Sequence, residues 1–177
     1  MFDRQTESWW QQFIGQAIVG EMTGVQLKML PSRVVPFSLL KAEHPDAKVL
    51  EAPRTTRRNY GANPYVNYDS ATEPFLYRGD YEGPGEALSY VIAVGKRAYL
   101  LDDIRRVGVL EQDGLRIQWQ EGMNSALDAS SIRRGRDIGF VRVQQTRGDG
   151  YEDLVFDMTF AFAFKAFHPD GEVISVP

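Results

Sequence analysis

Short runs of apolar residues, separated by glycine, proline and charged turns, dominate this chain and predict strands rather than long helices. The clearest runs lie in the second half, at Tyr90–Val94, Arg97–Leu100, Val109–Glu111 and Leu115–Gln120. Gly95-Lys96 and Asp113-Gly114 separate neighbouring runs, and Asp-Gly between two strands is a strong hairpin signal. The pattern therefore predicts antiparallel pairs over residues 90–120.

Further strands and short helices are predicted on both sides of this region. The expected strands are Ser8–Phe13, Ala17–Val19, Val25–Leu30, Ile138–Gln145 and Leu154–Met158. Asp102–Val107 predicts a short helix, because its early Asp pair suits a helix N-terminus and Gly108 suits the position after its end. Another helical turn is expected within Ser130–Arg134. The fold class that follows is α+β, mainly antiparallel β-sheet with a few short helices.

One pattern, Lys-Ala-x-His-Pro-Asp-x-x-Val, occurs twice, at Lys41–Val49 and Lys165–Val173. The two copies contain both histidines of the chain. In each copy the proline is expected to end a helix at the preceding histidine, and a turn and a short strand are expected to follow. The match therefore predicts an internal helix–turn–strand duplication.

The two copies differ in how firmly their helices are predicted. The first helix is expected to begin after Pro36, which suits a first helical turn, with an exit strand at Lys48–Leu50. The second is expected over Phe160–Phe167, with Thr159 as its N-cap and a strand at Glu172–Val176. The alternating phenylalanines of the second copy suit a strand equally well.

The length of 177 residues suits one β-rich domain over 1–177. Residues 51–85 interrupt the pattern, because they have no periodicity and are rich in Pro, Tyr, Asn, Arg and Gly. A loop this long in a compact domain is usually functional or poorly ordered. The alternative organisation is two halves, 1–52 and 86–177, joined by a long loop over 53–85.

Composition excludes several classes of function. The net charge of −4 argues against general affinity for nucleic acid or anionic membranes, and the absence of cysteine excludes disulfides, zinc–thiolate sites and thiol nucleophiles. No cofactor motif is present, and no apolar run approaches the length of a membrane span. Residues 1–15 lack the apolar core of a signal peptide, so a cytoplasmic protein is expected from the sequence as it stands.

The duplicated turns are the first candidate site. If the two copies face each other, their side chains form a mixed nitrogen and oxygen metal site. Its ligands are His44, Asp46, His168 and Asp170. The alternative is structural, because each Asp stabilises a turn and each His ends a helix, where a cation suits the dipole.

The long loop is the second candidate site. Its ligand-binding candidates, with Arg54 just upstream, are Arg57, Arg58, Tyr60, Asn63, Tyr65, Tyr68 and Asp69. Arginine and aromatic side chains together bind phosphate or stack on bases, and a small anionic ligand is a milder alternative. They also hold long loops against a domain through tyrosine hydroxyl groups, and the acidic net charge favours that interpretation. We expect Arg57, Tyr60, Tyr65 and Tyr68 to line a common pocket.

Two weaker signals remain. Trp9 and Trp10 point to opposite faces if they lie in a strand, so one of them is free to contact a sugar or a protein partner. Serine hydrolase chemistry is suggested only by Ser70 beside Asp69 and by Ser125 near Asp128. No Gly-x-Ser-x-Gly elbow is present, and only two histidines are available as a base.

Four stretches resemble a bacterial family called domain of unknown function 3179. They are Asp3–Gly24, Tyr60–Ser70, Ser125–Gly139 and Phe156–Gly171. The similarity spans nearly the whole chain, and the family has no established activity. Its full-length members carry a further N-terminal part with Cys-Pro-Leu-Cys and Trp-His-Glu motifs, often after an export signal. The resemblance therefore implies a shortened member, and an extracytoplasmic location if such a part precedes Met1.

The sequence favours a non-catalytic binding or interaction module. The alternatives are a metal-binding or hydrolytic enzyme domain that uses the His-Pro-Asp turns, or a truncated remnant of a longer protein. Self-association or a protein partner is expected, because a shortened β-rich domain leaves an open sheet edge and uncovered apolar residues near Met1-Phe2, Trp9-Trp10 and Phe13.

Overall fold

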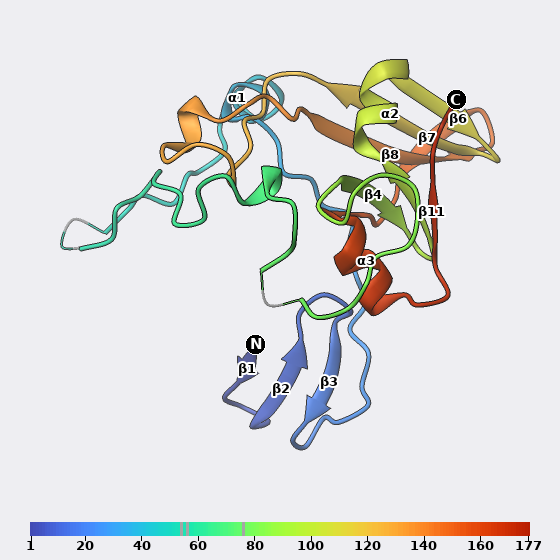
Figure 1. Ribbon diagram of the computed structural model, residues 1–177. Coiled ribbons are helices and arrows are strands. Elements are labelled where there is room, and N and C mark those ends of the chain that lie inside the picture. The colour runs from blue at the N-terminus through green and yellow to red at the C-terminus, as the bar shows by residue number, and fades with distance from the viewer. Residues whose placement is uncertain (54, 56, 76) are drawn as a thin grey trace.

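The structure is a computed structural model that describes residues 1–53, 55, 57–75 and 77–177 (Figure 1). Within these residues there are three α-helices and eleven strands, and the strands form three sheets. The α+β prediction is therefore confirmed. Pairing between the named strands is antiparallel, except that β11 (Glu172–Ile174) runs parallel to β5 (Arg97–Leu100). None of the described helices is long and apolar enough to cross a bilayer. Arg54 lies outside the described residues.

The central sheet has the strand order β10-β4-β5-β11, with β4 at Tyr90–Val94 and β10 at Asp157–Phe160. Helix α3 (Ala161–Phe167) follows β10 directly and leads to β11 at the opposite edge. The helix therefore crosses one face of the sheet, where it packs on β4 and β10. The predicted strands over residues 90–94 and 97–100 are confirmed.

The second sheet has the order β6-β7-β8-β9. Its strands are Val109–Gln112, Leu115–Gln120, Phe140–Arg147 and Gly150–Asp153. The predicted hairpin turn is confirmed, since Asp113 and Gly114 both have positive φ, at 52° and 77°, as a tight primed turn requires. Strand β9 was not predicted, because its residues Gly-Tyr-Glu-Asp show no apolar alternation.

Two apolar clusters cover the two faces of the central sheet. One lies between the two sheets and helix α2 (Leu101–Val107), and its buried members include Ile92, Tyr99, Ile104, Ile117, Val141 and Val143. The other lies under α3 and consists of Val91, Ala93, Ala98, Ala161, Phe164 and Val173. Because both faces are covered, β4 is an unbroken apolar run rather than an alternating one.

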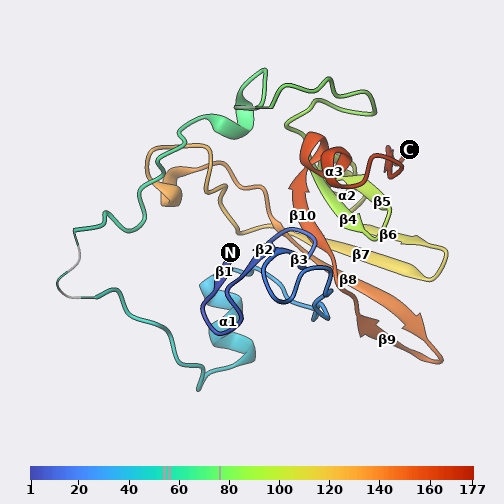
Figure 2. The same ribbon diagram turned by 90° about the horizontal axis from the view of Figure 1, so that it is seen from below.

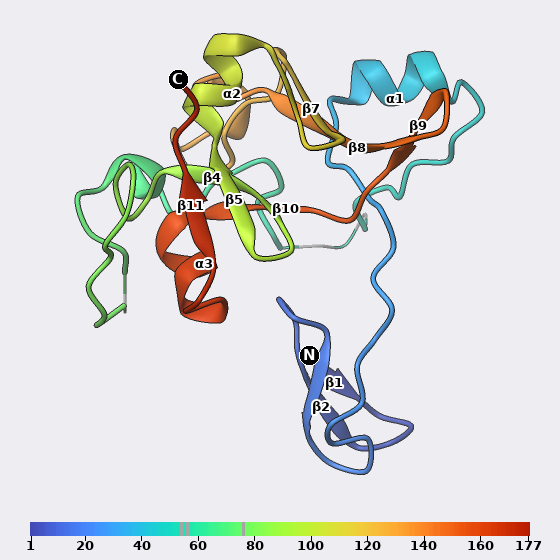
Figure 3. The ribbon, with the colours of Figure 1, turned by 90° about the vertical axis from the view of Figure 1, so that its right-hand side faces the viewer.

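A separate three-stranded sheet forms from the N-terminal residues. Its strands are β1 (Phe2–Asp3), β2 (Ser8–Gln11) and β3 (Gln16–Val19), in that order. Figures 1 and 3 show it below α3, where the ring of Phe13 stacks on Phe167 at 4.6 Å. The predicted strand over Val25–Leu30 is wrong, since that segment makes a single bridge, between Gln26 and Gln16.

The duplication is confirmed for the helix and the turn but not for the strand. Helix α1 (Phe37–Glu43) ends at His44 with φ −135° and ψ 73°, and α3 ends at His168 with φ −128° and ψ 73°. Lys48–Leu50 forms no strand, because no neighbouring strand is there to pair with it, whereas Glu172–Ile174 pairs with β5. Thr159 lies inside β10, and Phe160 occupies the N-cap position instead.

Candidate functional site

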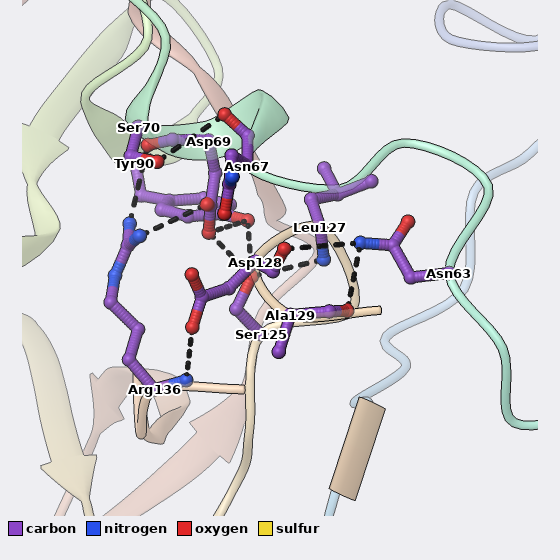
Figure 4. Close-up of polar contacts among 10 residues, drawn as sticks. All are labelled: Asn63, Asn67, Asp69, Ser70, Tyr90, Ser125, Leu127, Asp128, Ala129 and Arg136. Carbon is purple, nitrogen blue, oxygen red and sulfur yellow. Dashed lines mark hydrogen bonds and ion pairs between the residues drawn. The ribbon is translucent and has the colours of Figure 1, made fainter. Parts of the chain in front are cut away.

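A buried carboxylate, Asp69, is the centre of the candidate site. It lies in a single 3-10 turn, Tyr68–Ser70, and its side chain is fully shielded from solvent. The Ser125 hydroxyl donates to Oδ2 of Asp69 at 2.5 Å, and Nη1 of Arg136 donates to Oδ1 at 2.9 Å (Figure 4). A buried carboxylate requires such partners, because desolvation opposes its charge.

Tyr90, at the start of β4, completes this group. Its hydroxyl lies 3.4 Å from Oδ2 of Asp69 and 3.4 Å from the Ser125 hydroxyl oxygen. Burial is the main reason that the pKa of Tyr90 is raised above its usual value. Ser125 also accepts a hydrogen bond from the backbone N–H of Leu127, at 3.1 Å. These bonds fix the orientation of every side chain in the group, which we call the Asp69 network.

Two loops that are distant in sequence meet at the Asp69 network. Asn63, in the first loop (residues 60–70), is held by the second loop (residues 125–136). Its backbone N–H donates to the Ser130 carbonyl at 2.9 Å, and its side-chain amide donates to the Ala129 carbonyl at 3.2 Å. The N–H groups of Asn67 and Tyr68 donate to further carbonyl groups of the second loop. Figures 2 and 4 show residues 60–70 running beside residues 125–136. Residues 60–70 of the long loop are therefore held by a defined partner segment.

Two carboxylates, Asp128 and Asp137, stabilise the second loop and its end by accepting backbone N–H groups. Asp128 accepts the backbone N–H of Arg136 at 2.6 Å. Asp137 accepts the N–H groups of Gly122, Met123 and Gly139. Burial acts to raise the pKa of Asp137, but these backbone donors outweigh it, so the pKa is lowered and the carboxylate form is favoured.

A polar hollow of about 250 Å³ opens beside the Asp69 network. Asp69, Tyr90 and Arg136 line one part of it, and the Arg136 side chain remains 44% exposed. Arg105 lines another part, and its guanidinium lies over the Trp119 ring, 5.3 Å from the centroid. The remaining lining residues include Glu86, Asp102 and the hydroxyl groups of Ser70 and Ser89. The hollow thus combines two guanidinium groups with two exposed carboxylates.

The candidate ligand-binding residues of the long loop lie in three different environments. Asn63 and Asp69 are buried and take part in the contacts described above. Tyr65 and Tyr68 line a different, shallow hollow with Pro74 and Phe75. Arg57, Arg58 and Tyr60 are exposed and do not line the polar hollow beside Asp69. The expected common pocket is therefore not found among the described residues, and Asp69 alone of the candidates lines the polar hollow.

The proposed metal ligands are not brought together. Helices α1 and α3, which end at the two histidines, lie on different sides of the molecule in Figures 1, 2 and 3. Asp170 forms an ion pair with Lys96 at 2.5 Å, and His168 packs against Phe164 and Phe13. The described residues contain no group of three or more His, Cys, Asp or Glu that could hold a metal ion. The structure places His44 and Asp46 after α1 and His168 and Asp170 after α3, and the two copies do not face each other.

Three members of the Asp69 network were not predicted as ligand-binding residues. Tyr90 was expected only as part of a strand, Ser125 only as a hydrolase candidate beside Asp128, and Arg136 had no expected role. The available signal was the resemblance, since Tyr60–Ser70 and Ser125–Gly139 are two of the matching stretches and contain Asp69, Ser125 and Arg136. No local pattern shows that these two stretches make contact.

Asp157 is a second carboxyl group with an altered pKa. It pairs with Ala93 across β10 and β4, and Ala93 belongs to the cluster under α3, so the carboxyl lies on the α3 face. Burial raises its pKa above 3.8, and the charge of His168 opposes this effect more weakly. The protonated form is therefore favoured by folding.

We expect Asp157→Asn to raise the Tm by about 2 °C at pH 8 and to have little effect at pH 4. Because the folded-state pKa is raised, the carboxyl favours folding at low pH and loses that contribution as pH rises through the folded-state value. Asparagine cannot ionise, so it removes this loss. Thermal unfolding followed by circular dichroism tests the prediction, with Asp149→Asn in the exposed β8–β9 turn as the control. A gain that is larger at pH 4 than at pH 8 would contradict it.

Comparison with known proteins gives one finding. A family model described as a protein of unknown function, DUF3179, matches residues 1–171. This confirms the resemblance drawn from the four sequence stretches. No curated protein and no solved structure matches the chain.

Proposed function

This chain belongs to the DUF3179 family, and from its site we propose that it is a non-catalytic binding module whose polar hollow takes a small carboxylate. The observation that carries this proposal is the state of Arg136. Buried Asp69 fixes the guanidinium at one edge, while 44% of the side chain stays exposed at the hollow. An arginine held in this way loses little further side-chain conformational entropy when it binds a planar anion.

The charges of the hollow favour a singly charged ligand. Arg105 and Arg136 attract an anion, but Glu86 and Asp102 line the same hollow and repel a phosphate with two negative charges. A carboxylate with a small polar body satisfies both conditions. The cavity of about 250 Å³ also limits the ligand to a small molecule.

We expect Arg105→Gln to weaken binding of a small carboxylate about tenfold, and Asp102→Asn to strengthen it about threefold. Both side chains are exposed and lie outside the Asp69 network, so neither change should unfold the chain. Titration of acetate, pyruvate and glutamate, followed by amide chemical shifts, measures the affinities. Asp149→Asn is the charge-matched control for Asp102→Asn. If the two variants change the affinity in the same direction, or if no shifts map to the hollow, the proposal fails.

Hydrolysis has less support in this geometry. The Ser125 side chain is buried, and its hydroxyl is bonded to the Asp69 carboxylate, which is also paired with Arg136, rather than to a histidine. The network drawn in Figure 4 contains no histidine. Stoichiometric zinc, manganese or iron in protein purified without a histidine tag would favour the metal-enzyme alternative over the binding module.

A second proposed property is self-association through the N-terminal sheet, defined by β1, β2 and β3. Phe2 pairs with Trp9, and Trp9 pairs with Val19, so the three side chains form one row across a single face. They are 46%, 53% and 58% exposed, whereas Trp10, on the opposite face, is 8% exposed. The expectation that neighbouring tryptophans face opposite ways is thus confirmed, and the exposed row is a surface that a second copy can cover.

The total surface supports this proposal. The chain exposes 12435 Å², whereas a compact monomer of this mass exposes about 8,700 Å². A standard interface covers about 800 Å² on each partner, so the excess is more than a dimer contact requires. The row is also self-complementary in chemistry, since aromatic and aliphatic side chains pack equally well on their own copies across a two-fold axis.

A further inference from the structure

A second hollow, which we call the apolar groove, has a volume of about 730 Å³. It lies between the loop after β7, the start of β10 and residues 32–34. Its apolar lining comes chiefly from Val34, Ala126, Leu127, Ile132, Phe156 and Met158. This volume falls within the range of about 300–1,000 Å³ that is typical of small-molecule sites.

Among the described residues, the lining of the groove offers a ligand no unpaired charge. Arg33 lines it, but its guanidinium is paired with Glu43 at 3.3 Å. Asp157 also borders it, but its carboxyl lies on the α3 face of β10, opposite to the Met158 side chain that lines the groove. The lining therefore suits an uncharged molecule, because a buried ion would find no partner there.

Asn124 is a polar residue in the lining that can orient a ligand. The Asn124 amide nitrogen donates to the carbonyl groups of Ile132 and Arg133, at 3.3 and 2.9 Å, which fixes the side chain. Within the described part of the chain, the side-chain oxygen of Asn124 accepts no hydrogen bond. A fixed carbonyl oxygen of this kind favours a ligand with a hydroxyl or amide N–H group.

We propose that the apolar groove binds an uncharged, mainly apolar small molecule that carries one hydrogen-bond donor, such as a medium-chain alcohol. This site is distinct from the polar hollow, although Tyr90 and Ile138 line both. Binding replaces water on the apolar lining with hydrocarbon, which is favourable in proportion to the apolar surface covered. The donor group bonds to Asn124 and sets the direction of the chain.

Titration with phenylnaphthylamine, an uncharged dye that fluoresces in apolar sites, tests the proposal. We expect saturation at one dye per chain and displacement by decanol, with decanoate at pH 8 at least about tenfold less effective. Ala126→Phe fills an exposed part of the groove, and Leu127→Asp places a charge in it; each should lower dye affinity about tenfold. Asn124→Ala should weaken decanol more than it weakens the dye.

Matched variants separate the groove from other surfaces. Ala166→Phe adds the same side chain to the exposed face of α3 and should leave dye binding unchanged. Trp9→Lys and Arg105→Gln should also leave it unchanged, because they alter the N-terminal sheet and the polar hollow. Circular dichroism confirms that each variant is folded, and if Leu127→Asp unfolds, Ala126→Phe decides. Loss of dye binding in Trp9→Lys, normal binding in folded Ala126→Phe, or stronger competition by decanoate than by decanol overturns the proposal.

Discussion

Asp69→Asn is expected to lower the free energy of unfolding by about 3 kcal/mol and the Tm by about 8 °C. The carboxylate is fully buried and accepts from both Ser125 and Arg136, so an amide in its place presents an N–H group to at least one donor. Mutations that leave buried polar groups without partners cost this much because their desolvation is no longer compensated. Urea unfolding measures the change.

The control for this prediction is Asp149→Asn, the same substitution in the exposed turn between β8 and β9, which should change stability by less than about 0.5 kcal/mol. Ser125→Ala combined with Asp69→Asn completes a double-mutant cycle. If the network acts as one unit, the double variant loses less than the sum of the single losses. Additive losses, or an Asp69→Asn protein as stable as the parent, would show that the loops are held by other contacts.

Trp9→Lys is expected to weaken self-association about hundredfold, because exposed tryptophans at the centre of an interface commonly contribute most of its binding energy. Trp9 lies between Phe2 and Val19 in the row, and its ring is 5.1 Å from that of Phe2. A lysine there places two like charges opposite each other across a two-fold interface. Sedimentation equilibrium over a range of concentrations measures the dissociation constant.

Leu50→Lys is the matched control, since Leu50 is 97% exposed in the segment after α1 and lies outside the N-terminal sheet. This variant should associate like the parent chain. A parent protein that stays monomeric at high concentration would refute the self-association proposal and leave the ligand-binding proposals untouched. A dimer that persists in Trp9→Lys would place the interface elsewhere.

Local chemistry predicted much of the core. The hairpin at Asp113-Gly114 forms because both residues tolerate positive φ, and in β7 the apolar residues Leu115, Ile117 and Trp119 alternate with polar ones. The repeated Lys-Ala-x-His-Pro-Asp likewise gives two helices that end with nearly the same backbone angles at His44 and His168. In each case the residues that determine the geometry are adjacent in the chain.

The two copies of the repeated pattern differ in their tertiary contacts, which the local sequence did not predict. Helix α3 buries Ala161 and Phe164 against the central sheet, whereas α1 has no buried residue. Only the second copy continues into a strand, because β5 offers it an edge. Sequence similarity therefore predicted the turn that the two copies share, but not the different environments in which the two turns lie.

The residues of the candidate site come together only in the tertiary structure. Asp69 and Ser125 are 56 positions apart, and Asp69 and Arg136 are 67 apart. Neither loop has a periodic pattern that would show its partner, because their contacts are backbone carbonyl groups and single polar side chains rather than an apolar face. The sequence by itself determined strands β4 to β8, the hairpin at Asp113-Gly114 and the paired helical turns, whose interactions are local. Only the folded chain could bring a buried carboxylate, a serine and an arginine together, since long-range polar contacts leave no repeating signal in the sequence.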